Sequence, residues 1–178
     1  MMKLGAIYDY LDALSPFATQ AAWDNSGLLI GSKDDEIEQI YLSLDVDSKL
    51  LEEVLPNSLV ITHHPLIFSG LKQLNFAKYP SNLIQIMVQK KISLIAMHTN
   101  FDLSHLNAYV ASKLGFEIQE SREFVAYCEV NKSFDDLIVQ IKEVFGIEHI
   151  RVVKAKEWIN RCAITTGSGG DLISKIDA

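Results

Sequence analysis

Two short and almost continuously apolar runs constrain what this chain can fold into. Residues 58–61 (Ser-Leu-Val-Ile) and 92–97 (Ile-Ser-Leu-Ile-Ala-Met) have the length of strands, with little alternation of apolar and polar residues. Such strands are typical of parallel sheets, in which helices cover both faces. A helical pattern over residues 81–90 lies between them, as in a βαβ unit. The sequence therefore predicts an α/β protein with a mainly parallel sheet flanked by helices.

The other periodic segments extend this pattern over the whole chain. Further strands are expected at residues 28–30, 40–44, 124–130, 150–153 and 161–164, and further helices at residues 4–14, 49–55, 106–114 and 133–145. The order of elements predicts two related α/β halves. A break near residues 120–123 predicts an N-terminal half at residues 1–120 and a second half at residues 121–178.

Composition excludes several classes of protein. Of the 178 residues, 48% are hydrophobic, which argues against a disordered chain. The formal net charge of −7 argues against non-specific nucleic-acid binding. No apolar run approaches the roughly 18 residues of a membrane helix, and the N-terminus has no signal-peptide pattern. Cys128 and Cys162 lie in apolar, strand-like contexts and are expected to be free thiols, so we expect a cytoplasmic protein without a membrane partner.

Side chains that can bind metal follow three expected strands. They are Asp45 with Asp47, His63 with His64, and His98 with Asp102. In open parallel sheets, ligands bind outside the carboxyl ends of the strands, and neighbouring strands lie only about 4.8 Å apart. Imidazole with carboxylate suits Zn, Mn, Fe or Ni. The pattern predicts a metal site at this edge of the sheet.

The adjacent pair His63 and His64 favours two metal ions over one. Consecutive residues of an extended strand point to opposite faces, so the two imidazoles can each serve one ion if the strand has just ended and Pro65 turns the chain. Other readings stay open: the pair can lie in a solvated loop, and His98 can orient a ligand instead of binding metal. Aspartates such as Asp45 and Asp47 are more often turn or helix-cap residues than metal ligands.

Two loops have less specific patterns. Residues 167–170 (Gly-Ser-Gly-Gly) can form a backbone nest for a phosphate or simply a tight turn. Residues 23–27 (Trp-Asp-Asn-Ser-Gly) can line the same crevice as the histidines or close a loop.

Three motifs resemble those of one protein family. Residues 24–31 (Asp-Asn-Ser-Gly-Leu-Leu-Ile-Gly), 62–68 (Thr-His-His-Pro-Leu-Ile-Phe) and 98–102 (His-Thr-Asn-Phe-Asp) resemble the GTP cyclohydrolase I type 2 homolog family. It is also called the NGG-interacting-factor-like family, of dinuclear-metal toroidal hexamers. The motifs occur in the family's order, and residues 167–170 resemble its later glycine signature. The resemblance covers nearly the whole chain.

The resemblance implies a set of metal ligands. His63, His64 and Asp102 match the family's ligand positions for two divalent ions, whereas His98 matches a position beside the metals. The family completes its site with a His and a Glu from a C-terminal Gly-His…Glu motif, and this sequence stops before that motif. We therefore expect a longer full-length protein.

The resemblance also implies a function and a partner. It implies a metal-dependent hydrolase that opens the ring of a purine nucleotide with metal-activated water, with a nucleotide or phosphorylated small molecule as substrate. It further implies self-association into a homohexamer. Two alternatives remain: a phosphoesterase, because paired metals also hold phosphates, and a non-catalytic metal-binding or regulatory ring protein.

Overall fold

The structure, a computed structural model, describes residues 1–176 and divides into two compact units. The first unit is Met1–Phe101 and the second is Asp102–Ala178. This division precedes the one expected after residue 120, which falls inside strand β7 (Ile118–Arg122). The reason is that helix α5 (Asn107–Lys113), expected in the N-terminal half, packs against strands of the second unit.

The first unit is built on a four-stranded sheet with the strand order β2-β6-β5-β4. The strands are β2 (Gly27–Ile30), β4 (Gln39–Ser43), β5 (Ser58–Thr62) and β6 (Ser93–Ala96). β5 is parallel to both of its neighbours, β4 and β6, whereas β2 is antiparallel to β6. The parallel pairing expected from the two apolar runs is therefore confirmed at the centre of this sheet.

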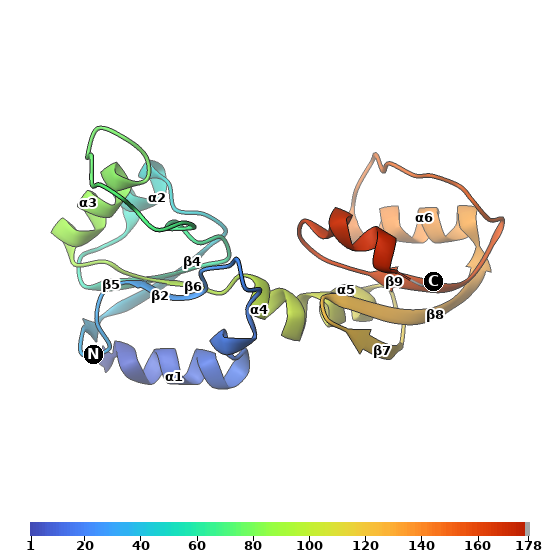
Figure 1. Cartoon of the computed structure of the whole chain (residues 1–178), viewed down its shortest axis with the longest axis horizontal. Helices are drawn as coiled ribbons and strands as arrows, with labels where there is room; N and C mark the ends of the chain where they lie inside the picture. Colours follow the sequence, from blue (N-terminus) through green and yellow to red (C-terminus); the bar gives the residue numbers. More distant parts are fainter. Residues whose placement is uncertain (177–178) are drawn as a thin grey trace. The chain divides into compact units, whose positions relative to one another are not determined.

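Helices cover both faces of this sheet (Figure 1). Helix α1 (Leu4–Leu14) lies on one face, and α2 (Ser48–Glu53) and α3 (Ser81–Lys90) lie on the other. Adjacent strand residues separate accordingly: Leu59 packs in the cluster with α1, and Val60 packs in the cluster with α2 and α3. Burial on both faces explains why these strands are continuously apolar.

Short elements complete the first unit. They are the antiparallel pair β1 (Met2–Lys3) and β3 (Glu36–Ile37), the 3₁₀ turn η1 (Phe17–Thr19) and the short helix α4 (Thr99–Phe101). Strands β1 and β3 were not expected from the sequence. Two residues each are too short for a period-2 pattern to be recognised.

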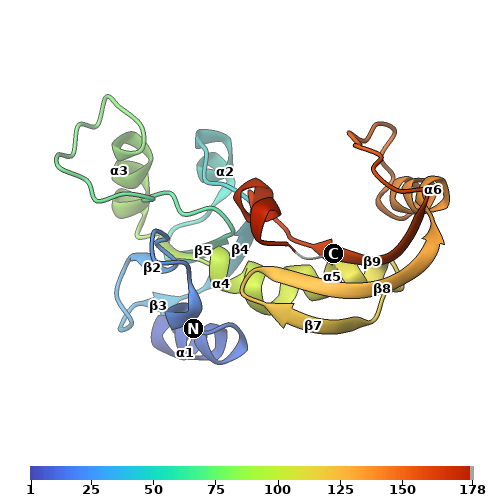
Figure 2. The ribbon, with the colours of Figure 1, turned by 45° about the vertical axis from the view of Figure 1, so that its right-hand side comes forward.

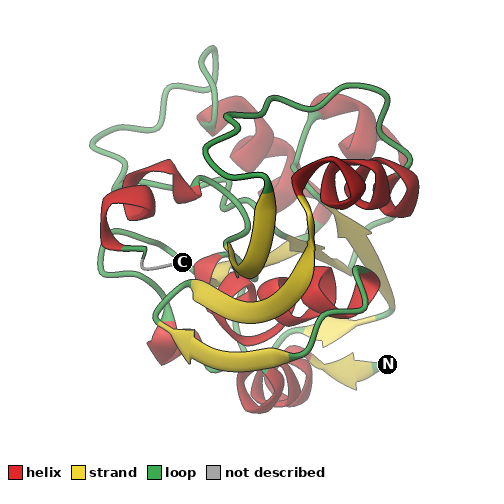
Figure 3. Cartoon of the chain, turned by 90° about the vertical axis from the view of Figure 1, so that its right-hand side faces the viewer, coloured by secondary structure: helices red, strands yellow, loops and turns green. Residues whose placement is uncertain are grey.

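The second unit contains an antiparallel sheet with the order β7-β8-β9 (Figure 3). It consists of β7, β8 (Val125–Ser133) and β9 (Trp158–Ile164), with the helices α5 and α6 (Phe134–Phe145) and the shorter turns η2 (Asp102–Leu106) and η3 (Gly169–Lys175). The mixed α/β class is confirmed, but the expectation of parallel pairing is wrong for this unit. β7 and β8 are separated by only two residues, a connection that can join antiparallel strands alone.

One expected strand of the second unit is absent. Residues 151–156 form an irregular connection between α6 and β9. Val152 and Val153 in this connection are exposed, so the apolar run that suggested a strand does not mark a buried segment. The curved strand β8, which leads directly into α6, is visible in Figure 2. Ser133 caps α6, accepting a hydrogen bond from the Asp136 amide at 3.1 Å.

The two cysteines face each other across the β8–β9 pair. Cys128 and Cys162 are register partners, and both are free thiols. Burial, and then the neighbouring Cys128 thiol, raise the pKa of Cys162 to about 12. A thiol that stays protonated is a poor nucleophile, so this pair has no feature of a reactive cysteine site.

Among residues 1–176, none of the helices combines the length and the apolar character needed to cross a bilayer. The expected cytoplasmic location stays a prediction.

The packing of α3 yields a test of the first unit's core. Met87 is fully buried against the sheet, whereas the next residue, Val88, is exposed on the same helix. We expect Met87→Ala to lower the free energy of unfolding by about 2–5 kcal/mol, because it leaves a cavity. Val88→Ala should leave stability within about 0.5 kcal/mol of wild type, as exposed substitutions usually do. Urea unfolding measures both, and equal losses would contradict this packing.

Candidate metal centre

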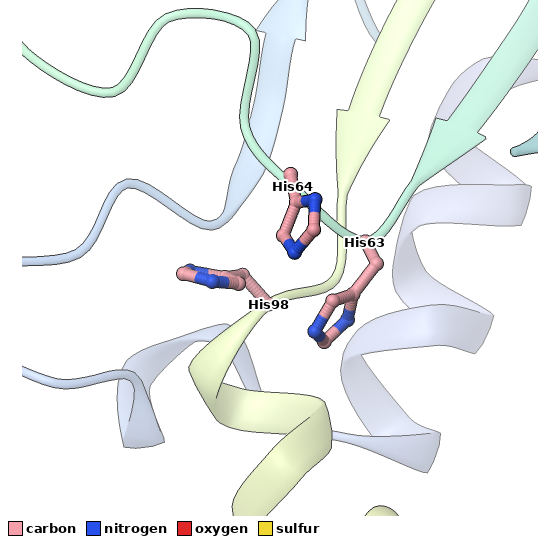
Figure 4. Close-up of side chains that lie close together, drawn as sticks. All are labelled: His63, His64 and His98. Carbon is pink, nitrogen blue, oxygen red and sulfur yellow. The ribbon is translucent and has the colours of Figure 1, made fainter. Parts of the chain in front are cut away.

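Three histidines converge at the carboxyl ends of two parallel strands. His63 and His64 directly follow β5, and His98 follows β6 after one intervening residue. Figure 4 shows the three imidazoles turned toward one another. Their ring centroids lie 5.0 Å apart for His63 and His64, 5.1 Å for His63 and His98, and 5.7 Å for His64 and His98.

The strand end explains how two consecutive histidines can face one site. β5 ends at Thr62, whose hydroxyl donates back to the His64 carbonyl at 2.9 Å. The His63 amide donates to the carbonyl of Ser43, the last residue of β4, and the His64 amide donates to the carbonyl of Leu44, the residue after it. The chain therefore leaves the extended conformation at the histidine pair. This is the condition under which the sequence predicted that both imidazoles could serve metal ions.

Each imidazole is held by a hydrogen bond at Nδ1. The partners are the Met97 carbonyl for His63 at 2.9 Å, Asp45 Oδ1 for His64 at 2.9 Å, and Asp24 Oδ1 for His98 at 2.8 Å. Carbonyl and carboxylate oxygens only accept, so Nδ1 carries the proton and the lone pair of the neutral ring lies on Nε2. This is the arrangement by which proteins orient metal-binding histidines.

The donor set fits a divalent metal ion. One ring nitrogen from each of the three histidines lies within 4.8 Å of the other two. Neutral imidazoles suit Zn, Mn, Fe and Ni. The fit therefore rests on two independent features, convergence of the rings and a hydrogen bond that fixes each tautomer.

His98 is held by a buried carboxylate. The Asp24 side chain is 0% exposed. Besides the His98 ring, the amide and hydroxyl of Thr99, the hydroxyl of Ser26 and the amide of Asn25 donate to it. Burial by itself raises the pKa of Asp24, but these hydrogen bonds outweigh it and lower the pKa to about 2. Asp24 is therefore an anion that fixes the His98 ring.

The hydrogen bond from His98 to Asp24 was not predicted from the sequence. Residues 23–27 were expected either to line the crevice of the histidines or to close a loop, and nothing local reveals a partner 74 residues away. The two aspartates after β4 behave differently from each other. Asp47 caps α2, accepting from the Leu50 amide at 2.7 Å, so its cap reading is confirmed. Asp45, 66% exposed, orients His64.

Asp102 is the first residue of the second unit. Its side chain is buried, and its Oδ1 accepts a hydrogen bond from the Thr166 hydroxyl at 3.1 Å. Gly167 also lies close to this carboxylate, since a Cβ added at Gly167 would lie 3.3 Å from Asp102 Oδ2. The glycine loop thus packs on this carboxylate. The roles of His63, His64 and Asp102 as metal ligands stay predictions.

Comparison with known proteins identifies relatives along the whole chain. A family model described as Duf34/NIF3 (NGG1p interacting factor 3) matches residues 2–178. A "GTP cyclohydrolase 1 type 2 homolog" of Campylobacter jejuni is 52% identical over 99% of this chain and 74% of its own length. A "GTP cyclohydrolase 1 type 2" of Helicobacter pylori is 41% identical over 94% of this chain and 70% of its own length.

Solved structures share the fold. A hypothetical protein of Staphylococcus aureus has a TM-score of 0.82 at 28% identity, covering 98% of this chain and 75% of that one. HcgD of Methanocaldococcus jannaschii, in its reduced form, has a TM-score of 0.79 at 23% identity, covering 94% of this chain and 71% of that one.

The two histidine–carboxylate pairs provide a matched test. Asp24→Asn replaces a buried anion by an amide whose NH₂ group faces donors, and we expect it to lower the free energy of unfolding by about 1.5–3 kcal/mol. Asp45→Asn changes an exposed pair and should cost at most about 1 kcal/mol. Thermal or urea unfolding compares them, and an Asp24→Asn protein as stable as wild type would contradict the role given to this carboxylate.

Proposed function

Since the chain belongs to the Duf34/NIF3 family, we propose that it binds two divalent metal ions and works as a metal-dependent hydrolase. The observation that carries this proposal is the convergence of His63, His64 and His98, each with Nδ1 hydrogen-bonded to an acceptor. The three histidines follow the ends of β5 and β6 and belong to neither hydrophobic core cluster, so core packing does not account for their convergence.

We assign the ligands His63, His64 and Asp102 to the two ions, with His98 beside them. The family resemblance supports the first three, and the geometry of the imidazoles supports the histidine pair. Zn, Mn, Fe and Ni all suit imidazole and carboxylate ligands. His98 has the same anchored geometry as the pair, so the structure supports a direct contact of His98 with metal as much as a positioning role.

Divalent ions at this site would supply Lewis acidity, which polarises a substrate oxygen and acidifies water. The chain's own residues prepare the site. The Met97 carbonyl, Asp45 and Asp24 hold Nδ1 of the three rings, so in each neutral ring Nε2 carries the lone pair that would bind metal. Asp24 also keeps a negative charge behind His98 throughout the ordinary pH range, because its pKa is about 2.

The substrate that we propose is a purine nucleotide whose ring is opened by hydrolysis. The printed names of the Campylobacter and Helicobacter relatives support this choice. Hydrolysis of a phosphoester is the alternative within the same chemistry. A non-catalytic, regulatory metal-binding ring protein is the alternative from another class.

Metal content tests the ligand assignment. We expect His63→Ala and Asp102→Ala each to lower metal occupancy at least about tenfold, because loss of a ligand exceeds the effect of losing an outer partner. His149→Ala, at an exposed position, serves as the control and should retain the wild-type metal content. Elemental analysis of the full-length protein after dialysis measures this. Unchanged occupancy in both ligand variants would remove these residues from the site.

Turnover tests the reaction. We expect full-length, metal-loaded protein to release formate from GTP, and His64→Ala to lose this activity together with metal. Release of phosphate from phosphoesters without formate would instead identify a phosphoesterase. Tight metal binding without turnover of either substrate would identify the non-catalytic class.

We also propose that copies of the chain assemble, as a homohexamer by family resemblance. Ile40, Leu42 and Leu44 alternate along and just beyond the edge strand β4, and all three are exposed. An apolar row on an unpaired sheet edge favours contact with another chain. Leu42→Glu should lower the mass measured by light scattering, whereas Val88→Glu, exposed on α3, should not. A wild-type full-length protein that is monomeric at micromolar concentration would contradict assembly.

A further inference from the structure

Two exposed aromatic side chains stand beside the histidine site. Trp23 is 63% exposed and Phe68 is 49% exposed. The Trp23 ring centroid lies 6.2 Å from that of His98, and the Phe68 centroid lies 6.5 Å from it. The two aromatic rings are 6.0 Å apart. A large apolar surface is thus presented to solvent at the one place in the first unit where metal-binding side chains converge.

These rings differ from the other aromatic pair of the first unit. Tyr8 and Phe17 stack with centroids 4.7 Å apart, and Phe17 is buried in the core with α1. That pair stabilises the fold by burial. Trp23 and Phe68 bury much less of their surface, so core packing does not account for their position.

Hydrogen bonds hold the two loops that carry these exposed rings. The loop that carries Trp23 is tied down by the amide of Ala21, which donates to the Thr99 hydroxyl at 2.9 Å. The Asn25 side-chain amide donates to the Ile67 carbonyl, which links this loop to the loop that carries Phe68. The loops that carry both rings are therefore held to each other and to Thr99, beside His98, which lowers the entropic cost of ordering them when a ligand binds.

The geometry suits a flat ring. The Trp23 and Phe68 rings are inclined by 45°, so they form a corner and not a parallel slot. A planar heteroaromatic ring can stack on one of them and present its edge to the other, and both arrangements are favourable for aromatic groups. Cationic ligands also bind aromatic corners, but the divalent ions proposed at the histidines would repel them.

We propose that Trp23 and Phe68 form a stacking surface that binds the planar base of the substrate and places it beside the histidines. This inference rests on the proposed function and deepens it, since it names a flat heteroaromatic ring as the group that the site recognises. It also gives Trp23, which the sequence placed either in the crevice of the histidines or in a closing loop, a part in selecting the substrate.

Fluorescence of Trp23 tests the contact directly. These 178 residues contain two tryptophans, so Trp158→Phe leaves Trp23 as the only tryptophan among them in the Zn²⁺-loaded protein. We expect rapid mixing with GTP to quench this fluorescence, because the base stacks on the indole. Inorganic triphosphate, which has the same charged group without a base, should bind without this quenching. Choline is the probe for a cationic ligand.

The binding affinities of variants test how much the two rings contribute to GTP binding. We expect Trp23→Ala and Phe68→Ala each to weaken GTP binding by about tenfold, within the range that base stacking on aromatic side chains gives, with triphosphate binding unchanged. Trp23→Phe should retain most of the affinity, because a stacking face remains. Tyr10→Ala, exposed on α1, is the matched aromatic control and should behave as wild type. Metal content is measured on every variant.

Several outcomes would overturn the inference. It fails if GTP and triphosphate affinities fall together in Trp23→Ala, if neither changes, or if choline quenches Trp23 and GTP does not. If Trp23→Ala loses its metal, Phe68→Ala decides by the same comparison. Metal-loaded protein that binds GTP through Trp23 but never hydrolyses it would contradict the proposed hydrolase alone, whereas turnover unaffected by both variants would contradict the stacking surface alone.

Discussion

The parallel pairing of β5 with β6 is the constraint on which the candidate site depends. In this register Thr62 is opposite Ala96, and the Met97 amide donates to the Thr62 carbonyl at 2.8 Å just beyond the last paired residues. This bond sets the histidines that follow the two strands at one edge of the sheet. A shift of the register by one residue would turn every side chain of the strand to the other face, which Leu59 and Val60 could not tolerate because both are fully buried. The core thus fixes the position of polar groups that lie outside it.

Much of this arrangement could be predicted from the sequence, because it depends on strong local patterns. The apolar runs predicted β5 and β6, and the histidines that follow them predicted a cluster at their carboxyl ends. The role of Asp24 could not be predicted, because it depends on a contact between segments that are far apart in the chain and that no local pattern connects. The family resemblance placed His98 beside the metals, and the sequence could not show that Asp24 orients its ring.

The second unit shows where periodicity misleads. Its strands β8 and β9 were expected. Whether neighbouring strands run parallel or antiparallel depends on the length of the connection between them. The two-residue connection after β7 was not recognised because β7 itself is mostly polar and exposed. Val152 and Val153 are residue types that are common in strands, yet they lie in an exposed connection. β propensity reflects how well a side chain fits a half-buried sheet, and it does not tell whether a neighbouring strand is there to pair with.

The three imidazoles are not equivalent, although they belong to one cluster. A buried anion lies behind His98, an exposed anion lies behind His64, and a neutral backbone carbonyl lies behind His63. A carboxylate pushes more electron density into the ring than a carbonyl does, and solvent screens the exposed one more than the buried one. A cation at His98 would therefore be attracted more strongly by the carboxylate behind the ring than a cation at His64, whose carboxylate lies in solvent. Two ions bound through these two rings would differ in how firmly they are held and in the order in which they leave.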